Sequence, residues 1–206
     1  MTLELLHAIG PVLAILLFAG LMLVYRRIYR FTRRPPGQVT AYLRAVSLEE
    51  VGNLLDPLVE QYLRLNLTKE QFRKEQRNRM WLALEYLGRL SHNALVIAEW
   101  GYYELRRTQR TRIAADRELS TKLLNASVQV RMCSFVLRAT INVWLVRVAL
   151  LPFLRPPSVA KLIDAGSTDL LEFYQTMRNA AAQLSQSYGD AYHQEMVEAL
   201  QVAATS

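Results

Sequence analysis

The pattern of apolar and polar positions separates one continuous apolar run from a series of amphipathic segments. Between Leu5 and Val24 the only strongly polar side chain is His7, and the run ends at Tyr25. A helix of this length reaches about 30 Å, the thickness of the hydrocarbon core of a bilayer. The pattern therefore predicts an N-terminal transmembrane anchor over residues 1–25.

Basic residues stand on only one side of this run. The leader from Met1 to Glu4 has one acid and no Lys or Arg, whereas a cleaved secretory signal carries basic residues before its apolar segment. Five arginines follow the run: Arg26, Arg27, Arg30, Arg33 and Arg34. Positive charge is retained on the cytoplasmic side, so we expect the N-terminus outside and the rest of the chain in the cytoplasm. Residues 26–39 are expected to form a basic juxtamembrane linker whose arginines meet anionic lipid headgroups.

Helix-start signals divide the remaining residues, 40–206, into a cytoplasmic α-helical bundle. The capping box that begins at Ser47 predicts a short helix over residues 40–55. Asp56 followed by Pro57 predicts a second over residues 57–66. A further capping box, from Thr68 to Gln71, opens the longest amphipathic pattern in the chain.

This longest pattern repeats with alternating steps of three and four residues, which is a heptad seam. Its members are Trp81, Leu84, Gly88, Ser91, Leu95, Ala98, Tyr102 and Leu105. The small residues among them predict a close approach of neighbouring helices. We therefore expect a central helix whose seam is buried, in which replacing Gly88 by Leu lowers the melting temperature.

The second half of the chain continues the helical pattern. Residues 106–122 are polar and basic and predict a helix end and a turn, and an apolar segment extends from Leu123 to Leu151. After the prolines beyond it, a short helix over 158–166 and a last helix capped by Ser167 or Thr168 are expected. The inner side of that last helix is predicted to hold Leu170, Phe173, Tyr174, Met177, Leu184 and Tyr188. With no strand alternation in the sequence, the fold class is all-α: an N-terminal transmembrane helix followed by a helical bundle with a long central helix.

Residues 132–154 leave open an alternative with a second transmembrane span. Their length is adequate, but Arg138 near the middle costs about 2.5–3.5 kcal/mol on insertion scales. Asn142 adds a further polar group, and Arg147 a further charge near one end. A bundle helix is therefore favoured, and a two-span accessory membrane subunit is the alternative.

Charge and cysteine content refine this picture. The net charge of +7 is uneven, because residues 25–131 carry 20 Lys and Arg against 11 Asp and Glu, whereas residues 155–206 carry three against six. A basic membrane-proximal half suits an anionic lipid surface. The single cysteine, Cys133, excludes an internal disulfide framework and fits a reducing compartment.

The sequence offers little support for catalysis. A di-iron bundle requires paired Glu-x-x-His motifs, and the nearest patterns are Asp190 with His193 and, more loosely, Glu85, His92 and Glu99. Phosphate-binding loops and nucleophile motifs are absent from the sequence. We therefore expect no enzymatic activity, no cofactor and no metal, and a bundle enzyme or ligand carrier is the least favoured alternative.

One cluster combines aromatic and basic side chains and is the candidate partner interface. It consists of Trp100, Tyr102, Tyr103, Arg106, Arg107 and Arg110. Such groups stack nucleotides, meet lipid headgroups or bind an acidic protein surface. Nucleic acid is disfavoured because the nearby membrane already accounts for the basic excess. The sequence thus favours a single-pass, membrane-anchored helical adaptor or accessory subunit that binds a protein partner or a second copy of itself.

Overall fold

The computed structural model describes residues 34–111, 114–150 and 168–201, which belong to one compact unit beginning at Arg33. This unit is the helical body of the protein. The predicted anchor over residues 1–25 lies outside the described residues. The same holds for four of the five arginines after it and for the expected helix over 158–166.

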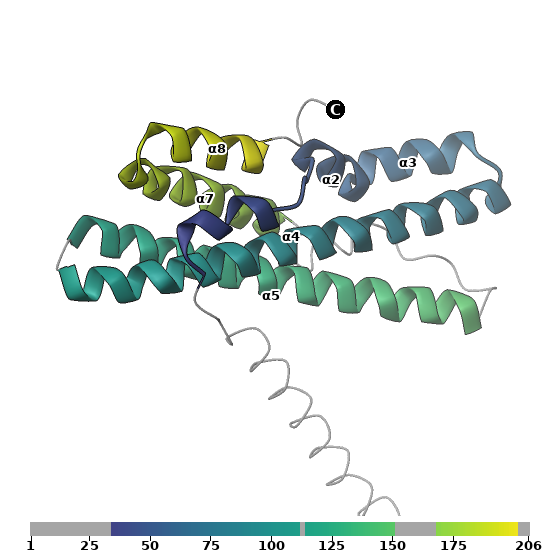
Figure 1. Cartoon of the computed structure of the whole chain (residues 1–206). Coiled ribbons are helices and arrows are strands. Elements are labelled where there is room, and N and C mark those ends of the chain that lie inside the picture. The colour runs from purple at the N-terminus through teal and green to yellow at the C-terminus, as the bar shows by residue number, and fades with distance from the viewer. Residues whose placement is uncertain (1–33, 112–113, 151–167, 202–206) are drawn as a thin grey trace, which may run out of the picture. The chain divides into compact units, whose positions relative to one another are not determined.

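The described residues form helices and contain no strand, so the all-α class and the long central helix are confirmed (Figure 1). The central helix, α4, has 43 residues. The elements in chain order are η1 (Pro36–Gln38), η2 (Thr40–Tyr42), α2 (Leu48–Leu55), α3 (Pro57–Asn66), α4 (Lys69–Thr111), α5 (Ala114–Leu150), α7 (Thr168–Ser185), η4 (Gln186–Tyr188) and α8 (Asp190–Gln201).

Side-chain caps set the starts of the first helices, although the first α-helix begins at Leu48 and not at residue 40, where the predicted range began. The Ser47 hydroxyl accepts a hydrogen bond from the Glu50 amide at 3.2 Å, and α2 begins at the next residue. The Asp56 carboxylate accepts from the Leu58 amide at 2.8 Å, with proline as the first residue of α3. At α4 the box is reciprocal, because the Thr68 amide donates to the Gln71 side chain while the Gln71 amide donates to the Thr68 hydroxyl.

Helices α4 and α5 lie side by side in opposite directions and make the largest helix contact in the body (Figure 1). Each presents a buried stripe with heptad spacing. On α4 the stripe is Met80, Ala83, Leu87, Leu90, Ala94, Ile97, Gly101, Glu104 and Thr108. On α5 it is Ser120, Leu123, Ser127, Val130, Ser134, Leu137, Ile141 and Trp144. Because both stripes repeat every seven residues, the two helices stay in contact along their length.

The buried stripe of α4 is displaced by one residue from the predicted seam, and the prediction of a buried seam is wrong. Trp81 is 59 % exposed, and Leu84, Ser91 and Leu95 are half-buried. A Cβ added at Gly88 would meet no atom within 4 Å. Apart from Ala98, which is fully buried, the predicted seam therefore lies along the flank of the hairpin, where no neighbouring helix approaches Gly88.

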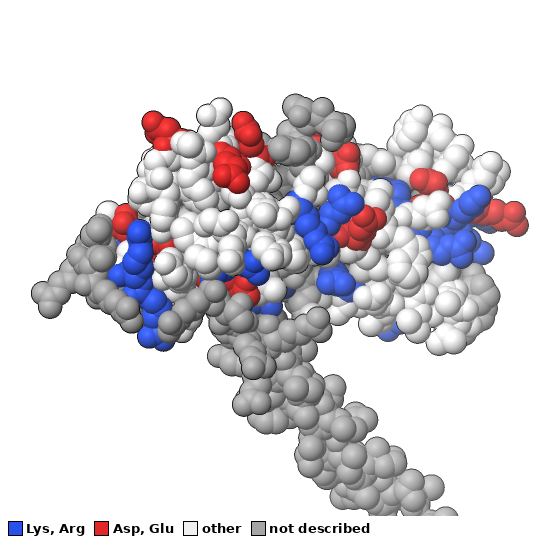
Figure 2. Space-filling model, viewed as in Figure 1, with Lys and Arg blue, Asp and Glu red and all other residues white. Residues whose placement is uncertain are grey.

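Charge is distributed unevenly over the surface of the body. In the view of Figure 2, acidic side chains gather over α8, whose exposed acids are Asp190, Glu195 and Glu198. The acidic tail of the sequence is therefore an acidic face.

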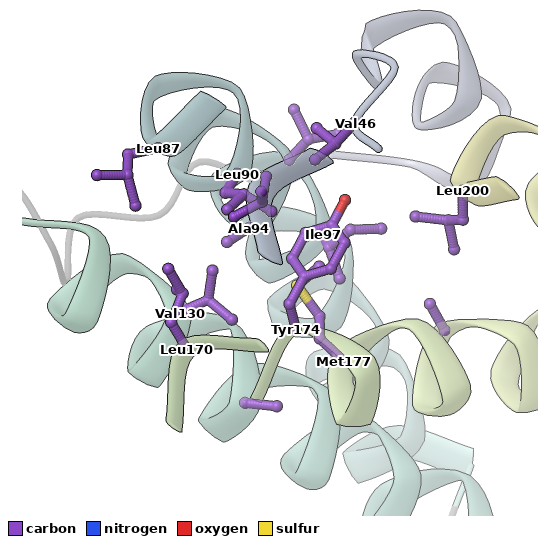
Figure 3. Close-up of a cluster of buried hydrophobic side chains, with 14 of the residues drawn as sticks. Val46, Leu87, Leu90, Ala94, Ile97, Val130, Leu170, Tyr174, Met177 and Leu200 are labelled. Atoms are coloured by element: carbon purple, nitrogen blue, oxygen red, sulfur yellow. The ribbon is translucent and has the colours of Figure 1, made fainter. Parts of the chain in front are cut away.

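The remaining helices cover the hairpin and complete one hydrophobic core. Helix α7 packs on α5 and α4, and α2 and α3 pack on α4. Figure 3 shows Leu87 and Ile97 of α4, Val130 of α5, and Tyr174 and Met177 of α7 meeting in this core. The inner residues predicted for the last helix are all in or against the core. The sequence predicts one helix there, but the chain turns at Gly189, whose φ of 97° suits glycine, and continues as α8.

The open space around Gly88 reverses the expected effect of its substitution. Gly88→Leu should raise the free energy of unfolding by up to about 1 kcal/mol, since leucine has the higher helix propensity. Gly101→Leu is the matched control: a Cβ there already lies 3.4 Å from Leu123 Cδ2, so overpacking should cost about 1–3 kcal/mol. Thermal melts of the full chain in mild detergent measure both. A lowered midpoint for Gly88→Leu would show that this flank is buried.

Candidate interaction surfaces

Residues 34–47, the segment before α2, lie along α4 and are held there by polar contacts; this segment is here called the strap. Arg34 Nε forms an ion pair with Glu99 Oε2 at 2.9 Å, and the guanidinium lies 4.3 Å from the centre of the Tyr42 ring. Val39 is fully buried. Residues 34–39, which the sequence assigns to the juxtamembrane linker, are thus part of the helical body, and Arg34 is held by it.

Asn93 of α4 fastens the next part of the same segment. Its side-chain oxygen accepts from the Arg44 amide at 2.8 Å, and its side-chain nitrogen donates to the Arg44 carbonyl at 2.7 Å. The same nitrogen lies 3.1 Å from the Tyr174 hydroxyl of α7. A single buried amide therefore joins the strap, α4 and α7.

The residues considered for a metal site are occupied by these and similar contacts. Glu99 pairs with Arg34, His92 Nε2 lies 2.9 Å from the Tyr42 carbonyl, and Glu85 pairs with Arg89 at 2.5 Å. His193 lies 2.9 Å from the Ser185 hydroxyl. Among the described residues, no three His, Cys, Asp or Glu side chains are grouped as a metal would require.

The predicted aromatic and basic interface is divided between core and surface. Trp100 is fully buried, where its ring packs against Tyr188 and Tyr192 at centroid distances of 6.4 and 6.3 Å. Tyr102 and Tyr103 are half-buried, and Arg106 donates to the Tyr102 hydroxyl at 2.9 Å. The side chain of Arg110 lies outside the described residues. Trp100 is therefore a core residue, and only the tyrosines and arginines beside it reach the surface.

A buried carboxylate anchors this aromatic cluster. Glu104 is 0 % exposed, forms an ion pair with Arg107 Nε at 2.8 Å and accepts a hydrogen bond from the Tyr188 hydroxyl. Burial, followed by the hydrogen bond to this carboxylate, raises the pKa of Tyr188 well above its usual range. Burial likewise raises the pKa of Tyr192, whose hydroxyl donates to the Pro36 carbonyl at 2.8 Å. Both phenols therefore remain neutral donors, and the cluster joins α4, η4, α8 and the strap.

Among the described residues, several exposed large apolar side chains lie along α5 and are here called the α5 outer stripe. It comprises Met132, Phe135, Val136, Val143, Val146 and Leu150. Among the described helices, Ala115–Leu150 is long and apolar enough to cross a membrane, and only 22 % of its most apolar stretch is buried in the body. In Figure 2 the lower edge of the body, over the second half of α5, is largely white with isolated blue. Apolar surface of this extent marks an interaction site.

An open groove lies between α5 and the flank of α4. Trp81 and Leu82 line it from α4, and Arg138 and Asn142 line it from α5. Trp81 is the exposed tryptophan, whereas Trp100 and Trp144 are buried. Two members of the predicted seam, Trp81 and Leu84, therefore line the same groove as Arg138 and Asn142 of α5.

A second, smaller apolar surface lies on α3 and is here called the α3 stripe. It consists of Leu58, Tyr62 and Leu65, of which Leu65 is 78 % exposed. Arg64 beside it pairs with the Glu60 carboxylate at 2.6 Å. Arg79 of α4 holds the junction of α2 and α3 through the carbonyls of Asn53 and Leu54, at 3.2 and 3.0 Å. The α3 stripe is therefore carried on a fixed element, with a paired charge beside it.

Comparison of the chain with models of protein families, with curated proteins and with solved structures gives no match. We therefore infer the function from the surfaces described above.

Removal of the buried carboxylate tests the aromatic cluster. Glu104→Ala should lower the free energy of unfolding by about 1–3 kcal/mol, because the Tyr188 hydroxyl is left without its partner in the core. The matched control is Glu85→Ala, whose side chain is 55 % exposed and pairs with Arg89, and which should cost about 0.2–0.5 kcal/mol. Denaturant unfolding of the two variants measures the difference. Equal losses would contradict a structural role for the buried carboxylate.

Proposed function

We propose that this protein is a single-pass, membrane-anchored helical adaptor or accessory subunit of a membrane protein complex. The observation that carries the proposal is the apolar run Leu5–Tyr25 with arginines on one side only. The asymmetry favours an N-terminus outside and the helical body at the cytoplasmic face of the cell membrane. The body works by binding and not by catalysis, with no cofactor.

The α3 stripe is the surface that we assign to the protein partner. Its three side chains recur at steps of four and three residues, which is the spacing of anchors in helix-to-groove recognition. Its neighbour Arg64 is already paired, so the stripe has little excess charge to attract lipid headgroups. A large apolar and aromatic set on an ordered helix suits the centre of a protein interface.

A two-span accessory subunit is the second candidate, and the poorly buried apolar stretch of α5 favours it. Two features oppose it. Arg138 and Arg147 are charges within the span, and Leu137, Ile141 and Trp144 are buried against the rest of the body. Crossing the bilayer would expose these core residues to lipid and separate α5 from α4.

The position of the C-terminus distinguishes the two candidates. A reporter that is active only in the cytoplasm, fused to the full chain after Ser206, should be active in the single-pass arrangement. A reporter that is active only after export, at the same position, is the control and should be silent. The reverse pair of results would place the C-terminus outside and favour the two-span arrangement.

The protein-binding role is tested by a pair of matched variants. Chains that co-purify with the wild-type protein in mild detergent should be lost from Tyr62→Ala/Leu65→Ala, since two exposed anchors of the α3 stripe are removed. They should remain with Val143→Ala/Val146→Ala, an exposed apolar pair on α5. Loss from the α5 variant alone would contradict the assignment of the partner to α3.

A further inference from the structure

The α5 outer stripe is flanked by positive charge and has no negative charge of its own. Arg138 and Arg147 are exposed beside the stripe, and after Glu118 the remainder of α5 contains no Asp or Glu. An apolar stripe bordered by arginines is the pattern of a helix that lies in a membrane interface. The long arginine side chains keep their heads at the phosphates while their stems cover apolar surface.

The surface around the α5 outer stripe also suits a membrane interface. Trp81 lines the groove beside Arg138, and tryptophan is enriched where headgroups meet acyl chains. The acid that lines this groove, Glu85, is paired with Arg89 at 2.5 Å. The acidic face of the body is carried by α8, which contains no Lys or Arg, whereas α5 after Glu118 contains no Asp or Glu.

The main competing occupant of this stripe is a second copy of the chain. Packing the stripe-bearing part of α5 against the same part of another copy would bring together surfaces that each present arginines and contain no acid to pair with them. Like charges across an interface are unfavourable. An anionic bilayer supplies both the apolar interior and the negative charge that the stripe lacks.

We propose that the helical body lies against an anionic lipid surface through the α5 outer stripe, with Arg138 and Arg147 at the headgroups. The inference rests on the proposed anchor in one respect, because the anchor holds the body next to the bilayer at high effective concentration. It goes further, since it assigns one face of the body to lipid. The α3 stripe then remains available to a protein.

The full chain, reconstituted into vesicles, tests this surface. Bimane is attached at Val146→Cys in a Cys133→Ser background, and the vesicles contain a phospholipid with bromine in the upper acyl chain. Bromine should quench the bimane in phosphatidylcholine mixed with phosphatidylglycerol, and less in phosphatidylcholine alone. The control label at Leu65→Cys, on the α3 stripe, should stay unquenched in both.

A charge variant tests the role of the arginines. Arg138→Gln/Arg147→Gln in the labelled background should lower the ratio of docked to undocked body by roughly 25-fold on anionic vesicles, since each arginine near the surface is expected to contribute about fivefold. Arg64→Gln on α3 is the matched control and should leave the ratio unchanged. Equal quenching in neutral and anionic vesicles, or no effect of the double variant, would overturn the anionic surface.

The remaining outcomes separate this inference from the proposed function. Absence of the protein from floated vesicles overturns the anchor and the lipid-facing surface together. Floating protein with unquenched bimane at Val146→Cys overturns the surface alone, and oxidative cross-linking between chains at that position then identifies a second copy as its occupant. Stronger quenching by bromine at the bilayer centre than by shallow bromine also overturns it, in favour of a crossing helix.

Discussion

The pairing of α4 with α5 through matching heptads is the constraint on which the rest of the body depends. Neither helix could bury its apolar stripe alone, and each fully buried large side chain in the pair contributes about 1.5–3 kcal/mol. The remaining elements pack on this α4–α5 hairpin: α7 contacts α5 and α4, whereas α2, α3 and the strap contact α4. The pairing of α4 with α5 also leaves one side of α5 uncovered by the described residues.

Buried polar groups determine how the outer elements are fastened to this hairpin. Asn93, Glu99 and Glu104 are all nearly inaccessible to water, and each reaches a partner outside α4. Buried polar atoms are costly without partners, so these contacts favour one position of the strap and of α7, η4 and α8 over others. Of the candidate metal ligands, Glu99 is one of these three residues and is engaged by Arg34.

Local signals in the sequence predicted the helix starts well, because capping is decided by residues three or fewer positions apart. The heptad period of α4 was also predicted correctly, but its register was not. The bulky Trp81 and Leu84 suggested the core, whereas the core positions include the small Ala83 and Ala94 and the polar Glu104 and Thr108. Periodicity alone cannot decide between two adjacent stripes when the partner helix is unknown.

The contacts that hold the candidate site residues could not be predicted either, because the partners lie far apart in the sequence. Arg34 meets Glu99 across 65 positions of sequence, and Tyr188 meets Glu104 across 84. Sequence spacing carries no information on such pairs. For this reason the sequence pattern placed Arg34 at the lipid surface and Trp100 in an interface. In the structure Arg34 forms an ion pair with Glu99, and Trp100 lies in the core.

The central claim is that the hairpin stays intact when the protein is on a membrane. Spin labels on groove residues of α4 and α5 test it most directly, in the full chain with Cys133→Ser in a bilayer. The two label pairs are Glu85→Cys with Arg138→Cys and Asn78→Cys with Asn142→Cys. Both pairs should give a single narrow distribution of short distances. A longer or broader distribution for the second pair than for the first would show α5 departing from α4 and would contradict this account.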